Sequence, residues 1–146
     1  MALKLRLVRD GEILFELPLS PVDWSKKKLQ DEFEAFEKDF QKYSRMFNAL
    51  SNQTRLKMMN RVVEEEDRTV RFVDFTRDLD LNPKIVWENS KKLRDGGFLE
   101  KTGRGEYRCS EFGQTAFITM SLALRHLIKT LEGINKNFKE VRNNVG

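Results

Sequence analysis

The chain has 146 residues, of which 39% are hydrophobic and 34% are charged, and its net charge is +4. This composition excludes a disordered chain and is typical of a helix-rich globular protein. No apolar run approaches the roughly 18 residues that a membrane span needs, so we expect no membrane partner. The N-terminus lacks the apolar core of a signal peptide, which indicates a cytoplasmic protein. The mild basicity is compatible with a nucleic-acid partner without specifying one.

Residues 1–24 are expected to form a β-hairpin and a linker. Apolar and polar residues alternate through LKLRLVRDGEILFELPL, on both sides of Asp10-Gly11. An Asp-Gly pair between two alternating runs favours a tight turn, because glycine tolerates a positive φ. An isolated hairpin is only marginally stable, so this one should pack on another element or pair across a dimer.

A single helix is predicted over residues 25–47, with Ser25 as its N-cap. Its apolar residues recur in steps of four and three, which places them on one helical stripe. Packing in a core is the favoured interpretation of this stripe, and a pocket for an apolar ligand is the alternative. The stripe comprises Leu29, Phe33, Phe36, Phe40, Tyr43 and Phe47.

Residues 48–110 predict three further helices and a second hairpin. The first helix is expected to be capped by Ser51 and to direct Leu56, Met59 and Val63 inward, and the next is short, with Phe72, Phe75 and Leu79 inward. A third helix begins at Pro83, because Asn82 is a preferred N-cap and proline fits the first helical position. It ends near Gly96-Gly97, and Phe98 to Cys109 reads as a hairpin around TGRGE.

The helix that begins at Pro83 has two chemically different sides. Val86, Ser90 and Leu93 are expected to point toward the core, and Lys84, Glu88 and Lys91 to point the opposite way. A Lys/Glu side alone is typical of a solvated helix, but here a short helix and a tight turn precede it, which is the order of a helix-turn-helix. The hairpin that follows adds three cations that suit phosphate or groove contacts. These are Lys101, Arg104 and Arg108.

Residues 111–146 predict one long helix that Ser110 caps and that ends near Val141. Its apolar residues alternate in steps of three and four, which is a heptad pattern. A helix of this length spans roughly 45–50 Å, more than the neighbouring domain can cover, so we expect a homodimer in which this helix meets its own copy. The expected dimerisation residues are Phe117, Met120, Leu124, Leu127, Leu131, Ile134 and Phe138.

Two segments resemble the ArsR-like family of winged helix-turn-helix transcription regulators. MFNALSNQTRLKMMNRVVEE is similar to the first helices of that family, and LNPKIVWENSKKLRDGGFLEKTGRGEYRCSEFGQTA to its recognition helix, wing and following helix start. The likeness covers about Arg45 to Ala116, half of the chain, and the N-terminal hairpin and the Phe-rich helix lie outside it. The general style of the whole chain looks like archaeal members of this group. The resemblance implies a winged helix-turn-helix. Together with the elements expected above, the predicted fold is mainly α with a small β component, with an N-terminal β-hairpin and long N- and C-terminal dimerisation helices.

The chain departs from the family pattern in three places. The metal-sensing members carry a cysteine pair before the recognition helix, where this chain reads RFVDFTRDLD, so we expect no metal site. One cysteine, Cys109, and one histidine, His126, are also too few for a soft-metal site within one subunit, and a lone cysteine excludes an internal disulfide. Ser90 replaces a larger apolar residue, which either loosens the helix or makes room for a bulky neighbour. Trp87 lies at the rim, where packing against the wing is the favoured of three interpretations, the others being a sugar or a protein contact.

The leading functional hypothesis is a homodimeric, sequence-specific regulator that binds double-stranded DNA through residues 83–95 in the major groove and 98–109 on the backbone or minor groove. The alternative is a winged-helix module that binds protein within the transcription machinery, because acidic residues leave residues 81–108 only +3. No nucleophile–base pair or phosphate loop indicates an enzyme or a cofactor, and a small-molecule effector stays open. The expected DNA contacts are Thr54, Arg55, Lys84, Trp87, Glu88, Lys91, Lys92, Lys101, Arg104 and Arg108.

Overall fold

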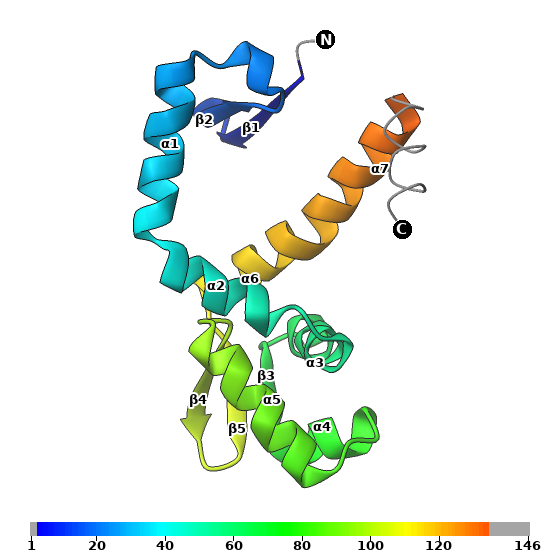
Figure 1. The fold of residues 1–146 in the computed structure, drawn as a ribbon. Helices are drawn as coiled ribbons and strands as arrows, with labels where there is room; N and C mark the ends of the chain where they lie inside the picture. Colours follow the sequence, from blue (N-terminus) through cyan, green and yellow to red (C-terminus); the bar gives the residue numbers. More distant parts are fainter. Residues whose placement is uncertain (1–2, 135–146) are drawn as a thin grey trace. The chain divides into compact units, whose positions relative to one another are not determined.

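The computed structural model describes residues 3–134. The chain divides into two compact units, an N-terminal unit that ends at Gln41 and a main unit that begins at Lys42, so the division falls inside the helix expected over residues 25–47. Helices predominate in the described chain, and the strands form two small antiparallel sheets (Figure 1), which agrees with the expected coarse fold class. A membrane crossing would need a longer and more apolar helix than any in residues 3–134.

The N-terminal unit begins with the predicted β-hairpin. Strand β1 (Lys4–Arg9) pairs antiparallel with β2 (Glu12–Pro18). Asp10 and Gly11 have φ angles of 50° and 82°, and two successive positive values are typical of the type I′ turn that Asp-Gly favours. Every described side chain up to Gln41 is at least partly exposed, so the hairpin is not covered by a buried core within its own unit.

Two helices replace the single helix predicted over residues 25–47. Ser25 caps the first, α1 (Lys26–Lys38), as expected, and the second is α2 (Phe40–Ala49). Asp39 separates them with a φ of −106°, and its N–H bonds to a carbonyl three residues earlier rather than four. Aspartate is a weak former of helix interiors, and this tightened turn ends the first helix.

Most of the apolar stripe of this region does not lie in a core as expected. Its four phenylalanines are 42–63% exposed, namely Phe33, Phe36, Phe40 and Phe47. Leu29 is half-buried, and Tyr43 is half-buried and packs against the core of the main unit. The expectation fails because spacing identifies which residues share a side of a helix, but not whether another element covers that side.

Helix α3 (Gln53–Glu64) opens the core of the main unit, and Asn52 caps it in place of the expected Ser51. The Asn52 side-chain oxygen accepts the N–H groups of Thr54 and Arg55 at 2.8 and 3.3 Å. Of the three residues expected inward, Met59 is fully buried, while Leu56 and Val63 are half-buried and pack against the core. The buried residues of the helix are Arg55, Met58, Met59 and Val62.

A short strand that the sequence did not predict, β3 (Thr69–Arg71), leads into α4 (Phe72–Asp78). Of the three residues expected inward on α4, Phe75 is fully buried, while Phe72 and Leu79 are half-buried and pack against the core. Helix α5 (Pro83–Asp95) begins and ends as predicted, and the Asn82 side chain accepts the Ile85 N–H at 2.9 Å.

The predicted second hairpin is confirmed as β4 (Leu99–Gly103) and β5 (Glu106–Cys109), and β3 adds to it in the order β3-β5-β4. Gly97, with a φ of 83°, reverses the chain after α5. The Gly97 and Phe98 N–H groups bond back to the last turn of α5, each at 2.9 Å, which is a Schellman ending. The hairpin consequently runs back beside α5, and its turn lies at the same end as the start of that helix (Figure 1).

The C-terminal helix contains an irregularity that the heptad pattern did not predict. Ser110 caps α6 (Glu111–Ile118) as expected, a π-helical turn follows at 119–123, and α7 (Leu124–Ile134) continues the helix. The π-turn adds a residue and changes which side chains share a stripe before and after it. The expected end near Val141 and the seam residue Phe138 lie outside the described residues.

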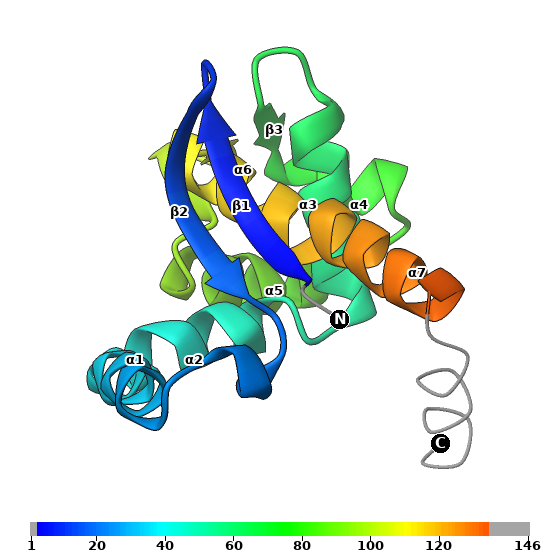
Figure 2. The same cartoon turned by 90° about the horizontal axis from the view of Figure 1, so that it is seen from above.

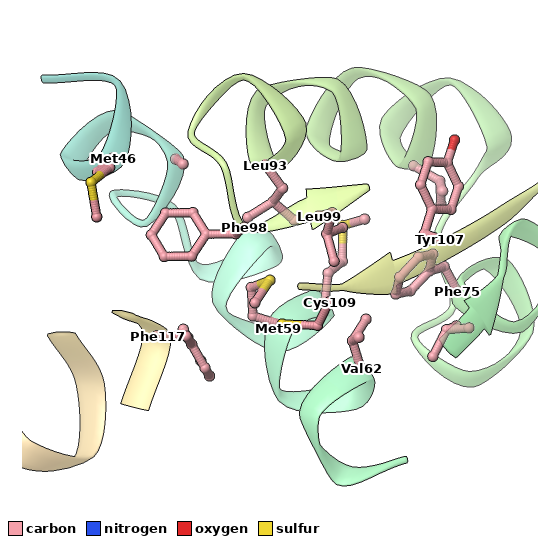
Figure 3. Close-up of a cluster of buried hydrophobic side chains, with 14 residues drawn as sticks. Met46, Met59, Val62, Phe75, Leu93, Phe98, Leu99, Tyr107, Cys109 and Phe117 are labelled. Atoms are coloured by element: carbon pink, nitrogen blue, oxygen red, sulfur yellow. The ribbon is translucent and has the colours of Figure 1, made fainter. Parts of the chain in front are cut away.

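The core of the main unit joins α3, α4, α5 and the three-stranded sheet (Figure 3). Phe98 is fully buried in it, and α6 approaches so closely that a Cβ on Gly113 would collide with the Phe98 carbonyl oxygen. Cys109 is also buried here, and burial raises the pKa of its thiol to about 11. The thiol therefore stays protonated and packs as a small apolar group.

Gly113→Ala should lower the free energy of unfolding by about 1–3 kcal/mol, because the new methyl group meets backbone that has little room to move. Gly133→Ala is the matched control, since nothing lies within 4 Å of its added Cβ, and it should raise that free energy by about 0.5–1 kcal/mol through helix propensity alone. Urea denaturation followed by circular dichroism measures both. Equal stabilities for the two variants would contradict this packing.

Candidate nucleic-acid interface

Arg55, one of the expected DNA contacts, is instead a buried structural residue. Its side chain is 5% exposed, and its guanidinium donates to the carbonyl oxygens of Asn48 and Ala49 at 2.9 and 2.8 Å and to Asn89 Oδ1 at 2.7 Å. Burial lowers the pKa of Arg55 from its ordinary value, but a guanidinium stays charged at any physiological pH. The expectation is wrong because helix position alone did not place Arg55 on the covered side of α3.

Helix α5 is held from two directions by polar contacts. Asn89 accepts from Arg55 and donates to the Ile85 carbonyl at 2.8 Å, so both ends of its amide are engaged. On the buried side, the Ser90 hydroxyl lies 3.4 Å from the Tyr107 hydroxyl of β5. Of the two interpretations of Ser90, the one in which it makes room for a bulky neighbour is confirmed. Sequence reasoning missed Asn89, and only its pairing with a buried arginine distinguishes it from a surface amide.

Four of the expected DNA contacts lie together on what we call the exposed face of α5. These residues are Lys84, Trp87, Glu88 and Lys91. Lys84 Nζ lies 4.0 Å from a Glu88 carboxylate oxygen, and Lys91 Nζ lies 5.7 Å from the Trp87 ring centroid. The predicted burial of Val86, Ser90 and Leu93 on the opposite side is confirmed, which fixes the direction of this face.

Trp87, for which packing against the β4–β5 hairpin was the favoured interpretation, has a side chain that is 56% exposed. The Lys91 ammonium, on the next turn of the same helix, lies over its ring. A large exposed aromatic ring beside a cation is well suited to stack on a flat or sugar-like surface, or to anchor a protein contact. The three interpretations of Trp87 therefore all stay open.

The turn of the β4–β5 hairpin is anchored to the core. Gly105 has a φ of 68°, and its carbonyl oxygen accepts the N–H of Phe72, the first residue of α4, at 2.7 Å. Arg104, between Gly103 and Gly105, is exposed at this turn. No Cβ-sized obstacle lies near Gly103, so a partner can approach the backbone closely on that side. Arg104 thus extends from a fixed support.

The two other cations of the hairpin lie on opposite sides of the sheet. Lys101 is paired with Tyr107, whose side chain faces α5, whereas Arg108 is paired with Glu100 and Thr69. Because side chains alternate across a strand, Arg108 lies on the side away from α5. The sheet therefore brings Lys101 and Arg104 to the side of α5 but does not bring Arg108 there.

The remaining expected contacts are dispersed. Thr54 is half-buried in the first turn of α3, where its N–H is already engaged by Asn52. Lys92 is exposed near the end of α5, where it lines a hollow with Arg45, Asn48 and Asp95. Arg45 was not among the predicted residues, and its position beside Lys92 depends on the α2–α5 packing, which no local pattern reveals.

The predicted dimerisation stripe is divided by the core of the main unit. Phe117 is only 4% exposed within its own chain, so its assignment to a dimer seam is wrong. Met120 is half-buried against that core, whereas Leu124 and Ile134 are each 49% exposed. Leu127 and Leu131 are half-buried. The available apolar stripe therefore begins at α7 rather than at α6.

In residues 3–134 no group of three or more His, Cys, Asp or Glu side chains is placed to hold a metal ion. Comparison of the chain with models of known protein families finds no match. A search of curated protein sequences likewise finds no similar protein.

Arg55→Met keeps an apolar stem but removes the three donated hydrogen bonds, so it should lower the free energy of unfolding by about 2–4 kcal/mol. Lys57→Met, on an exposed position of the same helix, is the matched control and should change stability by less than about 0.5 kcal/mol. Urea denaturation provides the measurement. If both variants were equally stable, Arg55 would not be the structural residue described here.

Proposed function

We propose that the chain is a homodimeric, sequence-specific DNA-binding regulator of the winged helix-turn-helix type. In this proposal α4 and α5 are the helix-turn-helix, α5 is the recognition helix, and the β4–β5 hairpin is the wing. The observation that carries it is the exposed face of α5, which presents cations, an acid and an aromatic ring from a helix whose other side is fully buried. A helix of this kind fits the major groove, where base edges offer distinct donors and acceptors.

The division of labour follows from the chemistry of each group. Lys84 and Lys91 contact phosphates or guanine edges, and Glu88 accepts from a cytosine amine. Arg104 reaches the backbone or the minor groove at the same end of the unit as the start of α5, with Lys101 on the same side of the hairpin. We assign no direct contact to Arg55 or Arg108, since one is buried and the other lies on the far side of the sheet.

A second candidate function is a protein-binding module. Two observations favour it: Trp87 is a large exposed aromatic residue of the type that anchors protein interfaces, and Glu88 partly neutralises Lys84. The two functions differ in their dependence on salt. DNA binding releases counterions and weakens steeply as salt rises, whereas an aromatic anchor in a protein interface depends on salt far less.

The DNA proposal predicts that purified protein selects a defined, near-palindromic sequence from a random pool. Lys84→Ala/Lys91→Ala should lose that sequence, and the slope of log affinity against log salt should become shallower by about two if both lysines neutralise phosphates. Lys26→Ala/Lys38→Ala removes the same charge from exposed positions of α1 and should leave affinity and slope unchanged. Equal losses in both variants, or no enriched sequence, would contradict the proposal and favour a protein partner.

The homodimer part of the proposal predicts that Leu124→Glu/Leu131→Glu gives a monomer, because a buried seam does not accept unpaired carboxylates. His126→Glu introduces the same charge on another side of the same helix and should remain dimeric. Sedimentation equilibrium over a range of concentrations distinguishes the two states. A double variant that dimerises as well as the unmodified chain would remove α7 from the interface.

A further inference from the structure

The N-terminal unit contains an aromatic hollow that the proposed function does not use. It has a volume of about 380 Å³ and opens between the base of the β1–β2 hairpin and α1, within the size range of small-molecule sites. Figure 2 shows the loop after β2 leading back to the start of α1. The lining residues come from the base of the hairpin, from the loop after β2 and from α1, and they are mostly apolar or aromatic. They include Leu17, Pro21, Trp24, Leu29, Phe33 and Phe36.

One wall of the hollow is fixed before any ligand binds. The Trp24 indole N–H donates to the Pro18 carbonyl oxygen at 3.0 Å, and the Trp24 backbone N–H donates to the Pro21 carbonyl oxygen at 3.2 Å. The next residue, Ser25, caps α1. The indole ring is therefore held in place at both its side chain and its backbone, and a fixed ring costs little conformational entropy on binding.

The charge of the hollow comes from a single carboxylate. Glu32 lies on α1 between the turns that carry Leu29 and Phe36, and it is the one ionisable residue of the lining. Among residues 3–134 no ion pair joins Glu32 to a cation, although Lys27 and Asp31 on the same helix do pair, at 3.5 Å. The faces of aromatic rings attract cations, and an unpaired carboxylate beside them adds to that attraction.

We propose that this hollow binds a lipophilic cation, meaning an organic ammonium or phosphonium ion that carries aryl or alkyl groups. Its apolar groups cover Leu29 and the exposed rings of Phe33 and Phe36, and its positive charge lies near Glu32 and the Trp24 ring. An uncharged apolar ligand would gain nothing from Glu32. A lipophilic anion would be repelled by it, although the chain as a whole carries a net charge of +4 and attracts anions elsewhere.

Tetraphenylphosphonium and tetraphenylborate provide a direct test, because they have nearly the same size and shape but opposite charge. The chain has two tryptophans, so Trp87→Phe leaves Trp24 as its one tryptophan, and Trp24 lines the hollow. Trp87 is 56% exposed, so its replacement should not affect folding. Titration of the full-length Trp87→Phe protein should give a saturable change in Trp24 fluorescence with the phosphonium ion and a much weaker one with the borate.

Two carboxylates on α1 allow a matched control. Glu32→Gln should weaken phosphonium binding roughly threefold to fivefold, as expected for loss of one charge pair at an open site. Glu34→Gln makes the same chemical change outside the hollow and should leave binding unchanged. The proposal is overturned if Trp24 shows no saturable change, if the borate binds as tightly as the phosphonium, or if Glu32→Gln binds like Glu34→Gln. Because no DNA is present, this result does not depend on the proposed regulator function.

Discussion

The main unit depends on one buried guanidinium. Arg55 joins the last carbonyls of α2 to α3 and, through Asn89, to α5, so three helices share a single polar contact point. Helix ends leave carbonyl groups without intrahelical partners, and a charged donor that bonds to two such groups offsets part of its own desolvation. Asn89 accepts from this guanidinium and donates to the Ile85 carbonyl oxygen of α5. Arg55 and Asn89 thus hold α5 in place, while Lys84, Trp87, Glu88 and Lys91 stay exposed on it.

A second set of contacts holds α5 on the side that faces the β4–β5 hairpin. Ser90 is small enough for the Tyr107 ring to reach the helix, and the Schellman ending at Gly97 returns the chain along it. The Gly105 carbonyl then ties the hairpin turn to the start of α4. Arg104 is consequently presented from a supported turn. A set of exposed side chains on fixed elements is what an interface needs, because little conformational freedom is lost when a partner binds.

The sequence predicted the elements that local signals determine and missed what depends on tertiary packing. Asp10-Gly11, Ser25, Asn82-Pro83 and Ser110 each mark a turn or a helix start through their own backbone chemistry, and each prediction is confirmed. Spacing also located the buried side of α5. It did not reveal that Arg55 and Phe117 are buried in the core or that β3 exists, because these outcomes depend on neighbours distant in the chain. The prediction that Arg108 lies with the other DNA contacts fails for a related reason, since only the strand pairing determines on which side of the sheet Arg108 lies.

The two tryptophan side chains report directly on the proposed contact between DNA and the exposed face of α5. Each indole N–H gives its own signal in a nitrogen-15 NMR spectrum, one from Trp87 on α5 and one from Trp24 in the N-terminal unit. Titration with a DNA duplex selected by the protein should shift or broaden the Trp87 signal at stoichiometric ratios while the Trp24 signal stays in place. An unchanged Trp87 signal in a saturated complex would contradict the account.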